Sequence, residues 1–281
     1  MTQLQEAYIV AATRTPVGKA PRGVFKNTRP DDLLVHAIQG ALAQVPTLDP
    51  KLIEDAIVGC AIPQGPQGLN MARMSVLFAG LPQSVGGVTV NRYCASGITA
   101  VAMAADRIRT GQADVMIAAG AESMSMVPMN AILTDMNPAI FEKDENLGIA
   151  YGMGLTAEKV AEQWNVSRED QDAFSVESHR RALAAQAAGY FDAEITPVTV
   201  RDTYVDLATQ ELKTKEFVVS KDEGPREGTT MEGLAKLKPV FAAKGSVTAG
   251  SSSQMSDGAA ALILVCERVL NEHNLTPIGR F

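Results

Sequence analysis

Short apolar runs alternate with amphipathic segments along the first 125 residues and return near the end of the chain. The runs are rich in small and β-branched residues and predict strands over Tyr8–Ala12, Ala56–Cys60, Val88–Val90, Ala113–Ala119 and Ala259–Cys266. Helical spacing predicts helices over 31–42, 70–78 and 98–109. Strands that alternate with helices indicate an α/β fold, in which helices cover a mixed, mostly parallel sheet.

The segment Tyr93–Ala105 contains no charged residue in 13 positions. A helix that is apolar on every side is normally buried on every side. We therefore expect this helix to run through the middle of its domain.

Charge is concentrated in one internal block, residues 126–249. This block holds 13 basic and 20 acidic residues, whereas the rest of the chain holds 12 of each. Its helical segments, 157–164 and 168–188, are charged, and Ser167 with Asp170 has the spacing of a capping box. The block is therefore predicted to be a more solvated unit inserted into a more buried one.

Composition excludes several classes of protein. With 46% hydrophobic and 20% charged residues the chain is not a disordered one. A net charge of −7 without a basic stripe argues against nucleic-acid binding. No apolar run reaches the roughly 18 residues of a membrane helix, and Met1–Arg14 has no signal-peptide pattern, so we expect a cytoplasmic protein. No metal or nucleotide motif is found, and we expect neither a metal nor a resident cofactor.

Three widely separated cysteines, without a CxxC pair, indicate free thiols. Cys94 lies where the strand 88–90 turns into the uncharged helix, among small residues that leave its sulfur accessible. A helix N-terminus can lower a thiol pKa from about 8.5 to between about 3.5 and 7.5. Position alone leaves two interpretations open, a nucleophile or an ordinary buried cysteine. Cys60 and Cys266, at the ends of apolar strands, are expected to be structural, and no histidine lies in a recognisable motif.

Several ordered segments resemble the thiolases, the acetyl-CoA C-acyltransferases. The segment VNRYCASGITAVA at 90–102 is similar to the family's nucleophile segment. Further similar segments follow the family's order: AATRTPVG (11–18), AAGAESM (118–124), MGLTAEKVA (153–161), SREDQDAF (167–174), GYFDAEITP (189–197), LAKLKPVF (234–241) and VTAGSSSQMSDGAA (247–260).

The resemblance implies a fold of two similar βαβαβαββ halves with a loop domain inserted in the first. It places the N-terminal core domain at 1–125 plus 250–281 and the CoA-binding loop domain at 126–249. The family's C-terminal core domain is expected to be absent from the chain.

The resemblance also implies a chemistry. Cys94 would be the acyl-accepting nucleophile in the cleavage of a 3-ketoacyl-CoA by CoA, or in the reverse condensation of two acetyl-CoA molecules. CoA and acyl-CoA are then substrates rather than cofactors, and the setting is fatty-acid metabolism, including β-oxidation. Family members are homodimers or homotetramers, which we expect for the full-length form.

The resemblance also implies CoA-binding residues, at the positions where this chain matches the family. Arg226 matches the family's arginine near the adenine nucleotide, and the positions that line the pantetheine arm are Met153, Phe241, Ala249, Gly250 and Ser253. Residues 212–244 carry seven basic and five acidic side chains, which suits a ligand that bears phosphates.

The chain also departs from the family. Ser251 and Gly152 stand where many or some thiolases have Asn and His, which bears on substrate preference. The family's Asn-Glu-Ala-Phe, Gly-His-Pro and Cys-x-Gly segments do not occur, so we expect the 281-residue chain alone to be inactive or nearly so. Two alternatives stay open: a non-catalytic acyl-CoA-binding or remnant subunit, and a condensing enzyme like the ketoacyl synthases.

Overall fold

The computed structural model describes residues 4–128 and 136–281. Their contacts divide the chain into two compact units. Unit 1 comprises 1–131, 192–223 and 255–281, and unit 2 comprises 132–191 and 224–254. The loop domain predicted at 126–249 includes residues 129–135, which lie outside the described part, and the hairpin at 198–219, which belongs to unit 1.

Unit 1 is built on a mixed sheet of seven strands among the described residues. The order is β4-β3-β5-β8-β1-β9, with β2 paired to β8. Five strands run in one direction, and β8 and β9 run against them. The strands are β1 (Ala7–Arg14), β2 (Gly18–Lys19), β3 (Asp55–Gly59), β4 (Val88–Val90), β5 (Val115–Ser123), β8 (Ser256–Cys266) and β9 (Gly279–Arg280).

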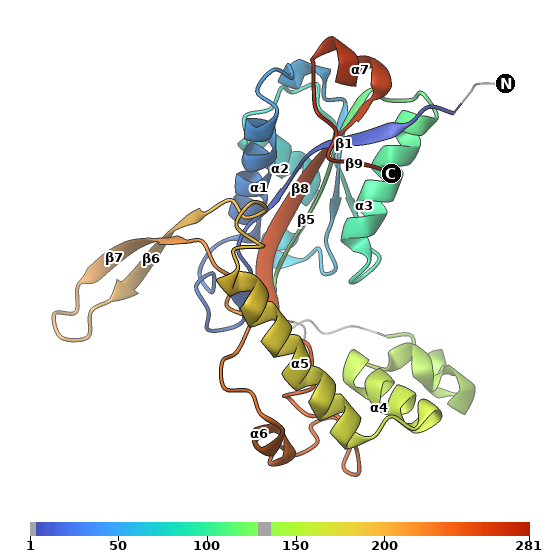
Figure 1. Ribbon diagram of the computed structural model, residues 1–281, viewed down its shortest axis with the longest axis vertical. Coiled ribbons are helices and arrows are strands. Elements are labelled where there is room, and N and C mark those ends of the chain that lie inside the picture. Colours follow the sequence, from blue (N-terminus) through green and yellow to red (C-terminus); the bar gives the residue numbers. More distant parts are fainter. Residues whose placement is uncertain (1–3, 129–135) are drawn as a thin grey trace. The chain divides into compact units, whose positions relative to one another are not determined.

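Helices cover both faces of this sheet. The chain passes from β3 through α2 (Met71–Phe78) to β4 on one side, then through α3 (Ser96–Arg109) back past β3 to β5 on the other. Right-handed crossovers in opposite directions put the two helices on opposite faces. Figure 1 shows α1 (Pro30–Gln44) beside α2 and α3 across the sheet, while α7 (Glu267–Glu272) follows β8. The predicted α/β class is confirmed.

Local sequence explains where these helices begin. Pro30 occupies the first turn of α1 and is followed by two acidic residues, which the helix dipole favours. Asn70 caps α2 by accepting a hydrogen bond from the Arg73 backbone N–H at 3.1 Å. The core beneath them is apolar, and every member of the main hydrophobic cluster lies in unit 1.

The prediction that the uncharged helix is buried on every side is wrong for this chain. The sheet covers the α3 face that carries Ala100, Ala104 and Ile108. On the other side Ile98 is 62% exposed and Met103 is 41% exposed. The helix therefore has two apolar faces, and the sheet covers only one of them.

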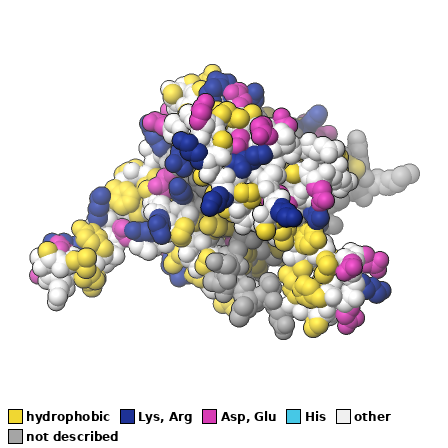
Figure 2. All heavy atoms as spheres, turned by 90° about the horizontal axis from the view of Figure 1, so that it is seen from below, with side chains coloured by type: hydrophobic (Ala, Val, Ile, Leu, Met, Phe, Trp, Pro, Cys, Tyr) yellow, Lys and Arg dark blue, Asp and Glu magenta, His cyan; other side chains and the backbone are white. Residues whose placement is uncertain are grey.

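A hairpin of β6 (Val198–Val205) and β7 (Leu212–Val219) extends from unit 1. Its base joins the core through Val198, Val200 and Val219. Its outer part exposes apolar side chains, seen in yellow at the left of Figure 2, and Leu207 in its turn is 91% exposed.

Unit 2 contains the helices α4 (Met153–Trp164), α5 (Arg168–Ala187) and α6 (Met231–Ala235), and two 3₁₀ segments at Pro138–Phe141 and Asp144–Ala150. The predicted capping box is confirmed: the Ser167 hydroxyl accepts from the Asp170 backbone N–H, and the Asp170 carboxylate accepts from the Ser167 N–H. Asn165, in the left-handed region at φ 53°, ends α4.

Candidate active site and ligand-binding segments

Cys94 lies in a tight turn between β4 and α3, and its side chain is exposed. Tyr93, just before it, has φ 48°, a left-handed conformation that is unusual for a large side chain. The Arg92 N–H donates to Ser96 Oγ at 2.8 Å, and the Ser96 hydroxyl donates to the Tyr93 carbonyl at 2.6 Å. Asn91 accepts from the Tyr93 N–H at 2.8 Å, so hydrogen bonds hold the turn on both sides of Cys94.

Two glycines of the sheet, Gly59 and Gly120, let the start of α3 lie directly against it. A Cβ on Gly59 would lie 2.5 Å from the Ser96 carbonyl carbon and 2.7 Å from the Gly97 nitrogen. A Cβ on Gly120, in β5, would lie 3.3 Å from the Gly59 carbonyl oxygen. Glycine in a strand interior often marks such a close approach of two backbones. The packing of β3 and β5 therefore determines where the Cys94 turn sits.

This position suits a nucleophile. Cys94 follows the carboxyl end of a parallel strand, where α/β sheets commonly bind ligands. It precedes α3, whose N-cap position, Ala95, makes no side-chain capping bond. The sulfur is exposed at the N-terminal end of α3, where a substrate can reach it. The strand-turn-helix placement parallels the nucleophile elbow of the hydrolases.

The other two cysteines are buried, as predicted for structural thiols. Burial and, next, the charge of Glu122 raise the pKa of Cys60 to about 12. Burial also raises the pKa of Cys266, whose thiol donates to Asp114 Oδ1 at 3.1 Å. Neither group is a thiolate near neutral pH.

A buried polar network near the carboxyl ends of β3 and β5 was not predicted from the sequence. The Gln67 amide donates to Glu122 Oε1 at 2.5 Å and accepts from the Ser123 N–H at 2.5 Å. Glu122 Oε2 accepts from the Ala61 N–H at 2.7 Å. These bonds satisfy backbone groups where the strands end, and they fix the chain on the sheet side of the Cys94 turn.

In unit 2, Phe241 packs against Gly154, the residue that follows Met153 at the start of α4. A Cβ on Gly154 would overlap the Phe241 ring, so the ring lies flat against the backbone next to Met153. Both side chains are exposed, as a ligand-facing wall requires. Two of the predicted pantetheine positions are thus neighbours.

The segment 239–240, just before Phe241, pairs with the segment 247–248, just before Ala249 and Gly250. The Val240 N–H donates to the Val247 carbonyl at 3.1 Å, and Pro239 bridges Thr248. The buried Thr248 hydroxyl accepts from the N–H groups of Gly250 and Ser251 at 3.2 and 3.3 Å. A threonine turn therefore shapes the backbone at the predicted positions.

Glu158, on α4, connects this helix to the segment 246–247. Its carboxylate accepts from the Ser246 N–H at 2.9 Å and from the Val247 N–H at 3.0 Å. The helix that begins at Met153 is thereby attached to the segment that leads to Ala249.

Arg226 and Ser253 are both exposed. The Arg226 backbone N–H donates to His179 Nδ1 at 3.2 Å, and its carbonyl accepts from the Thr229 hydroxyl at 3.0 Å. His179, on α5, therefore positions the loop that carries Arg226, a role that its sequence context did not indicate. The Ser253 hydroxyl donates to the Gln254 carbonyl at 3.4 Å.

The predicted residues fall in two units. Cys94 belongs to unit 1, and the six predicted CoA positions belong to unit 2. Unit 2 also contains a cavity of about 540 Å³ between α4 and residues 242–246, and none of the six positions lines it. Within 4–128 and 136–281, no cluster of three or more potential metal-ligating side chains occurs, and no helix is long and apolar enough to span a membrane.

Comparison with known proteins decides the family. The sequence profile of the thiolase N-terminal domain matches residues 7–268. The chain belongs to the thiolase family. It is 46% identical to the 3-ketoacyl-CoA thiolase of Bacillus subtilis over 278 residues, and 44% identical to the peroxisomal 3-ketoacyl-CoA thiolase 2 of Arabidopsis thaliana over 276. The crystal structure of the Bacillus anthracis acetyl-CoA acetyltransferase matches this thiolase with a TM-score of 0.85 at 36% identity.

The matches cover a larger share of this chain than of its relatives. The matches cover 98% to 100% of the chain but 70%, 58% and 70% of these three relatives, respectively. The resemblance seen in the sequence is confirmed, and with it the acyltransferase class at the level of the family. The chain corresponds to the N-terminal part of its thiolase relatives.

Of the two departures from the thiolase pattern, the one at Ser251 has a local explanation and the one at Gly152 has none. Ser251, at the position of the family's Asn, accepts from the Thr248 N–H at 3.0 Å and so closes the threonine turn itself. Gly152 precedes α4 as its N-cap and makes no side-chain capping bond. The turn is therefore complete without the Asn.

Proposed function

We propose that this chain is the N-terminal part of a thiolase that cleaves 3-ketoacyl-CoA with CoA through an acyl-Cys94 thioester. The observation that carries the proposal is the exposed Cys94 in a hydrogen-bonded turn at the start of α3, within the segment that resembles the family's nucleophile segment. The names of the relatives agree with this assignment.

In the proposed reaction, the Cys94 thiolate attacks the 3-keto carbon and a C–S bond forms. The C2–C3 bond then breaks, and its electron pair goes to C2, which is protonated and leaves as acetyl-CoA. The sulfur of a second CoA attacks the thioester, releases acyl-CoA and returns the thiolate. The reverse sequence condenses two acetyl-CoA molecules.

The Cys94 backbone N–H is proposed to stabilise the tetrahedral oxyanion. It lies at the start of α3, where the helix dipole adds to its positive character. One such donor is typically worth about 10²- to 10³-fold in rate. Proton transfer to C2 and activation of the thiol are proposed to depend on the C-terminal half of the thiolase fold.

CoA is proposed to bind unit 2, with its nucleotide at Arg226 and its pantetheine arm along Met153, Phe241, Ala249, Gly250 and Ser253. The contact of Phe241 with Gly154 and the threonine turn at 248–251 support a continuous wall for the arm. We also propose a homodimer or homotetramer, which would cover exposed apolar side chains of unit 1 such as Phe78 and Ile98.

A role in fatty-acid β-oxidation and a cytoplasmic location are part of the proposal. A bacterial relative, that of Bacillus subtilis, is consistent with this location. The relatives from Arabidopsis thaliana and Mus musculus are named peroxisomal, so an organellar location is the alternative.

The test is thiolysis of acetoacetyl-CoA by the 281-residue chain mixed with the C-terminal half of a relative. We expect turnover by the wild type and by Cys60→Ala, and none by Cys94→Ala. Mass spectrometry should find the acyl group on the Cys94 peptide. CoA binding without turnover in this mixture would contradict the enzyme proposal and favour a non-catalytic binding subunit.

A further inference from the structure

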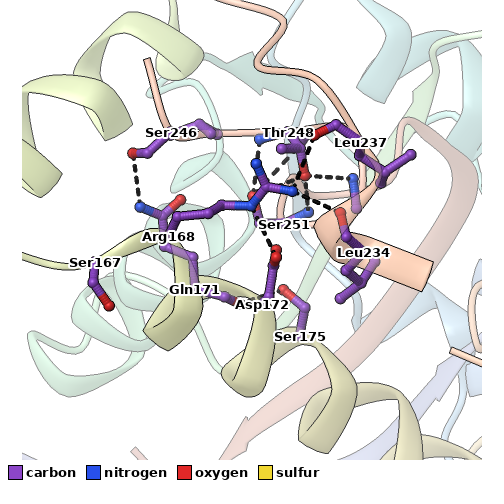
Figure 3. Close-up of polar contacts among 12 residues, drawn as sticks. Ser167, Arg168, Gln171, Asp172, Ser175, Leu234, Leu237, Ser246, Thr248 and Ser251 are labelled. Carbon is purple, nitrogen blue, oxygen red and sulfur yellow. Dashed lines mark hydrogen bonds and ion pairs between the residues drawn. The ribbon is translucent and has the colours of Figure 1, made fainter. Parts of the chain in front are cut away.

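Arg168, in the first turn of α5, connects three parts of unit 2. Its Nε donates to Asp172 Oδ2 at 2.8 Å, one helical turn further along. Its outer nitrogen Nη2 donates to the carbonyls of Leu234 at 2.6 Å and Leu237 at 3.1 Å. Figure 3 shows Arg168 between Asp172 and these two carbonyls.

The two carbonyls belong to the end of α6 and the turn after it. The Leu234 carbonyl also accepts from the Leu237 N–H at 2.9 Å, and a basic side chain near the last carbonyls of a helix is favourable. Asp172 is 2% exposed, so the carboxylate that orients the guanidinium is itself removed from water. A charge-assisted hydrogen bond in such surroundings is strong, so the end of α6 is firmly held to α5.

The side chains of the same two leucines support Gly250. A Cβ on Gly250 would lie 2.5 Å from Leu234 Cδ2 and 2.8 Å from Leu237 Cδ1. The backbone of the threonine turn therefore rests on these side chains. A second tie runs from α5 to this segment, because the Gln171 amide donates to Ser246 Oγ at 2.9 Å (Figure 3).

We propose that Arg168, held by Asp172, is a positioning residue for the pantetheine arm of CoA. It fixes Leu234 and Leu237, and these leucines place the backbone of Ala249 and Gly250 where the arm binds. This inference rests on the CoA site proposed above. The nucleotide end is anchored separately, since the Arg226 loop is bonded to His179 near the middle of α5.

The separate anchors allow a sharp test by calorimetric titration of the 281-residue chain. The probes are CoA and 3′-phosphoadenosine 5′-diphosphate, which is CoA without its pantetheine arm. For Arg168→Met we expect the dissociation constant for CoA to rise about tenfold or more, the value of one or two bonds to a charged donor. The constant for the nucleotide should stay within about twofold of the wild type.

Arg168→Lys is the second variant, and it tests the positioning role of Arg168 if Arg168→Met does not fold. Its single ammonium group can pair with Asp172 but cannot reproduce the guanidinium fork. We expect it to bind CoA more weakly than the wild type and more tightly than any folded Arg168→Met. Arg180→Met is the matched control, because Arg180 is exposed on the same helix and paired only with the half-buried Glu177 among the described contacts.

Three outcomes would overturn the inference. Unchanged CoA binding in both Arg168 variants would show that the arm does not depend on Arg168. Equal weakening of CoA and the nucleotide would show a general structural role. Failure of the wild type to bind either probe would remove the proposed CoA site itself, and that result is distinct from the first two.

Discussion

The two units are stabilised by different interactions. Unit 1 has a continuous apolar core beneath α1, α2 and α3. In unit 2, only four of the described residues are buried, and two of them, Asp172 and Thr248, are polar. Unit 2 is held instead by bonds from Glu158, Arg168 and Gln171 to backbone and hydroxyl groups. Close packing should therefore control the position of Cys94, and charged hydrogen bonds should control the ligand-binding segments.

The largest effect is expected from a change in the tight packing of unit 1. Gly59→Val would place side-chain atoms in the backbone of Ser96 and Gly97, where even a Cβ has no room. Overpacking costs roughly 1–3 kcal/mol or more, and the start of α3 must move. We expect a lower urea midpoint and a changed rate of Cys94 alkylation.

Gly258→Ala is the control for this change. It lies in β8 of the same sheet, and its Cβ would meet Thr15 Oγ1 at 3.5 Å, an ordinary contact distance. If Gly59→Val were as stable as the wild type, close packing would not be what positions Cys94, and the contrast between the units would fail.

An intermediate effect is expected in unit 2 from Glu158→Gln. The substitution keeps the shape but removes the charge that accepts from the Ser246 and Val247 N–H groups. Bonds to a charged group are worth about 1.5–3 kcal/mol, and the amide oxygen retains part of this. Amide hydrogen exchange at Ser246 and Val247 should accelerate, whereas the core strands of unit 1 should exchange as before.

Glu162→Gln tests whether any loss of charge on α4 has this effect. Glu162 is exposed and pairs with Lys159 on the same helix. We expect no change in exchange at Ser246 or Val247. Acceleration across β5 and β8 in Glu158→Gln would contradict the separation of the two units.

The sequence was most informative where structure depends on neighbours in the chain. Strand and helix periodicity located β1, β3, β5, β8 and α3, and the spacing of Ser167 and Asp170 located the capping box. The resemblance singled out Cys94, which the structure places in an exposed turn. All of these features depend on residues that are close in sequence or on a motif that can be read directly.

The positioning residues were missed because their partners are distant in sequence. Glu158 bonds to residues 88 and 89 positions away, Arg168 to a carbonyl 66 positions away, and His179 to a backbone N–H 47 positions away. Each is an ordinary polar residue on a charged helix until the fold brings its partner near. The exposed face of α3 has a related cause, because apolar composition does not show which surface covers it.

The smallest expected effect concerns the difference between the buried and the exposed cysteine within unit 1. Burial, followed by the charge of Glu122, raises the pKa of Cys60 from its ordinary 9.0 to about 12. The folded state therefore holds this proton more tightly than the unfolded state. The resulting stabilisation is fully present below about pH 9 and is lost as the pH rises toward about 12.

Cys60→Ala should consequently lose less stability than the wild type between about pH 7 and about pH 10, as measured by urea midpoints at each pH. Cys94→Ala is the control for loss of an exposed thiol, and its urea midpoints are measured over the same pH range. Near pH 8, iodoacetamide should label Cys94 before Cys60, since only the thiolate reacts and the folded structure keeps Cys60 protonated. Equal labelling of the two thiols in the folded chain would mean that the end of β3 opens readily, and the tight packing assigned to unit 1 would then not extend to the strand beneath the Cys94 turn.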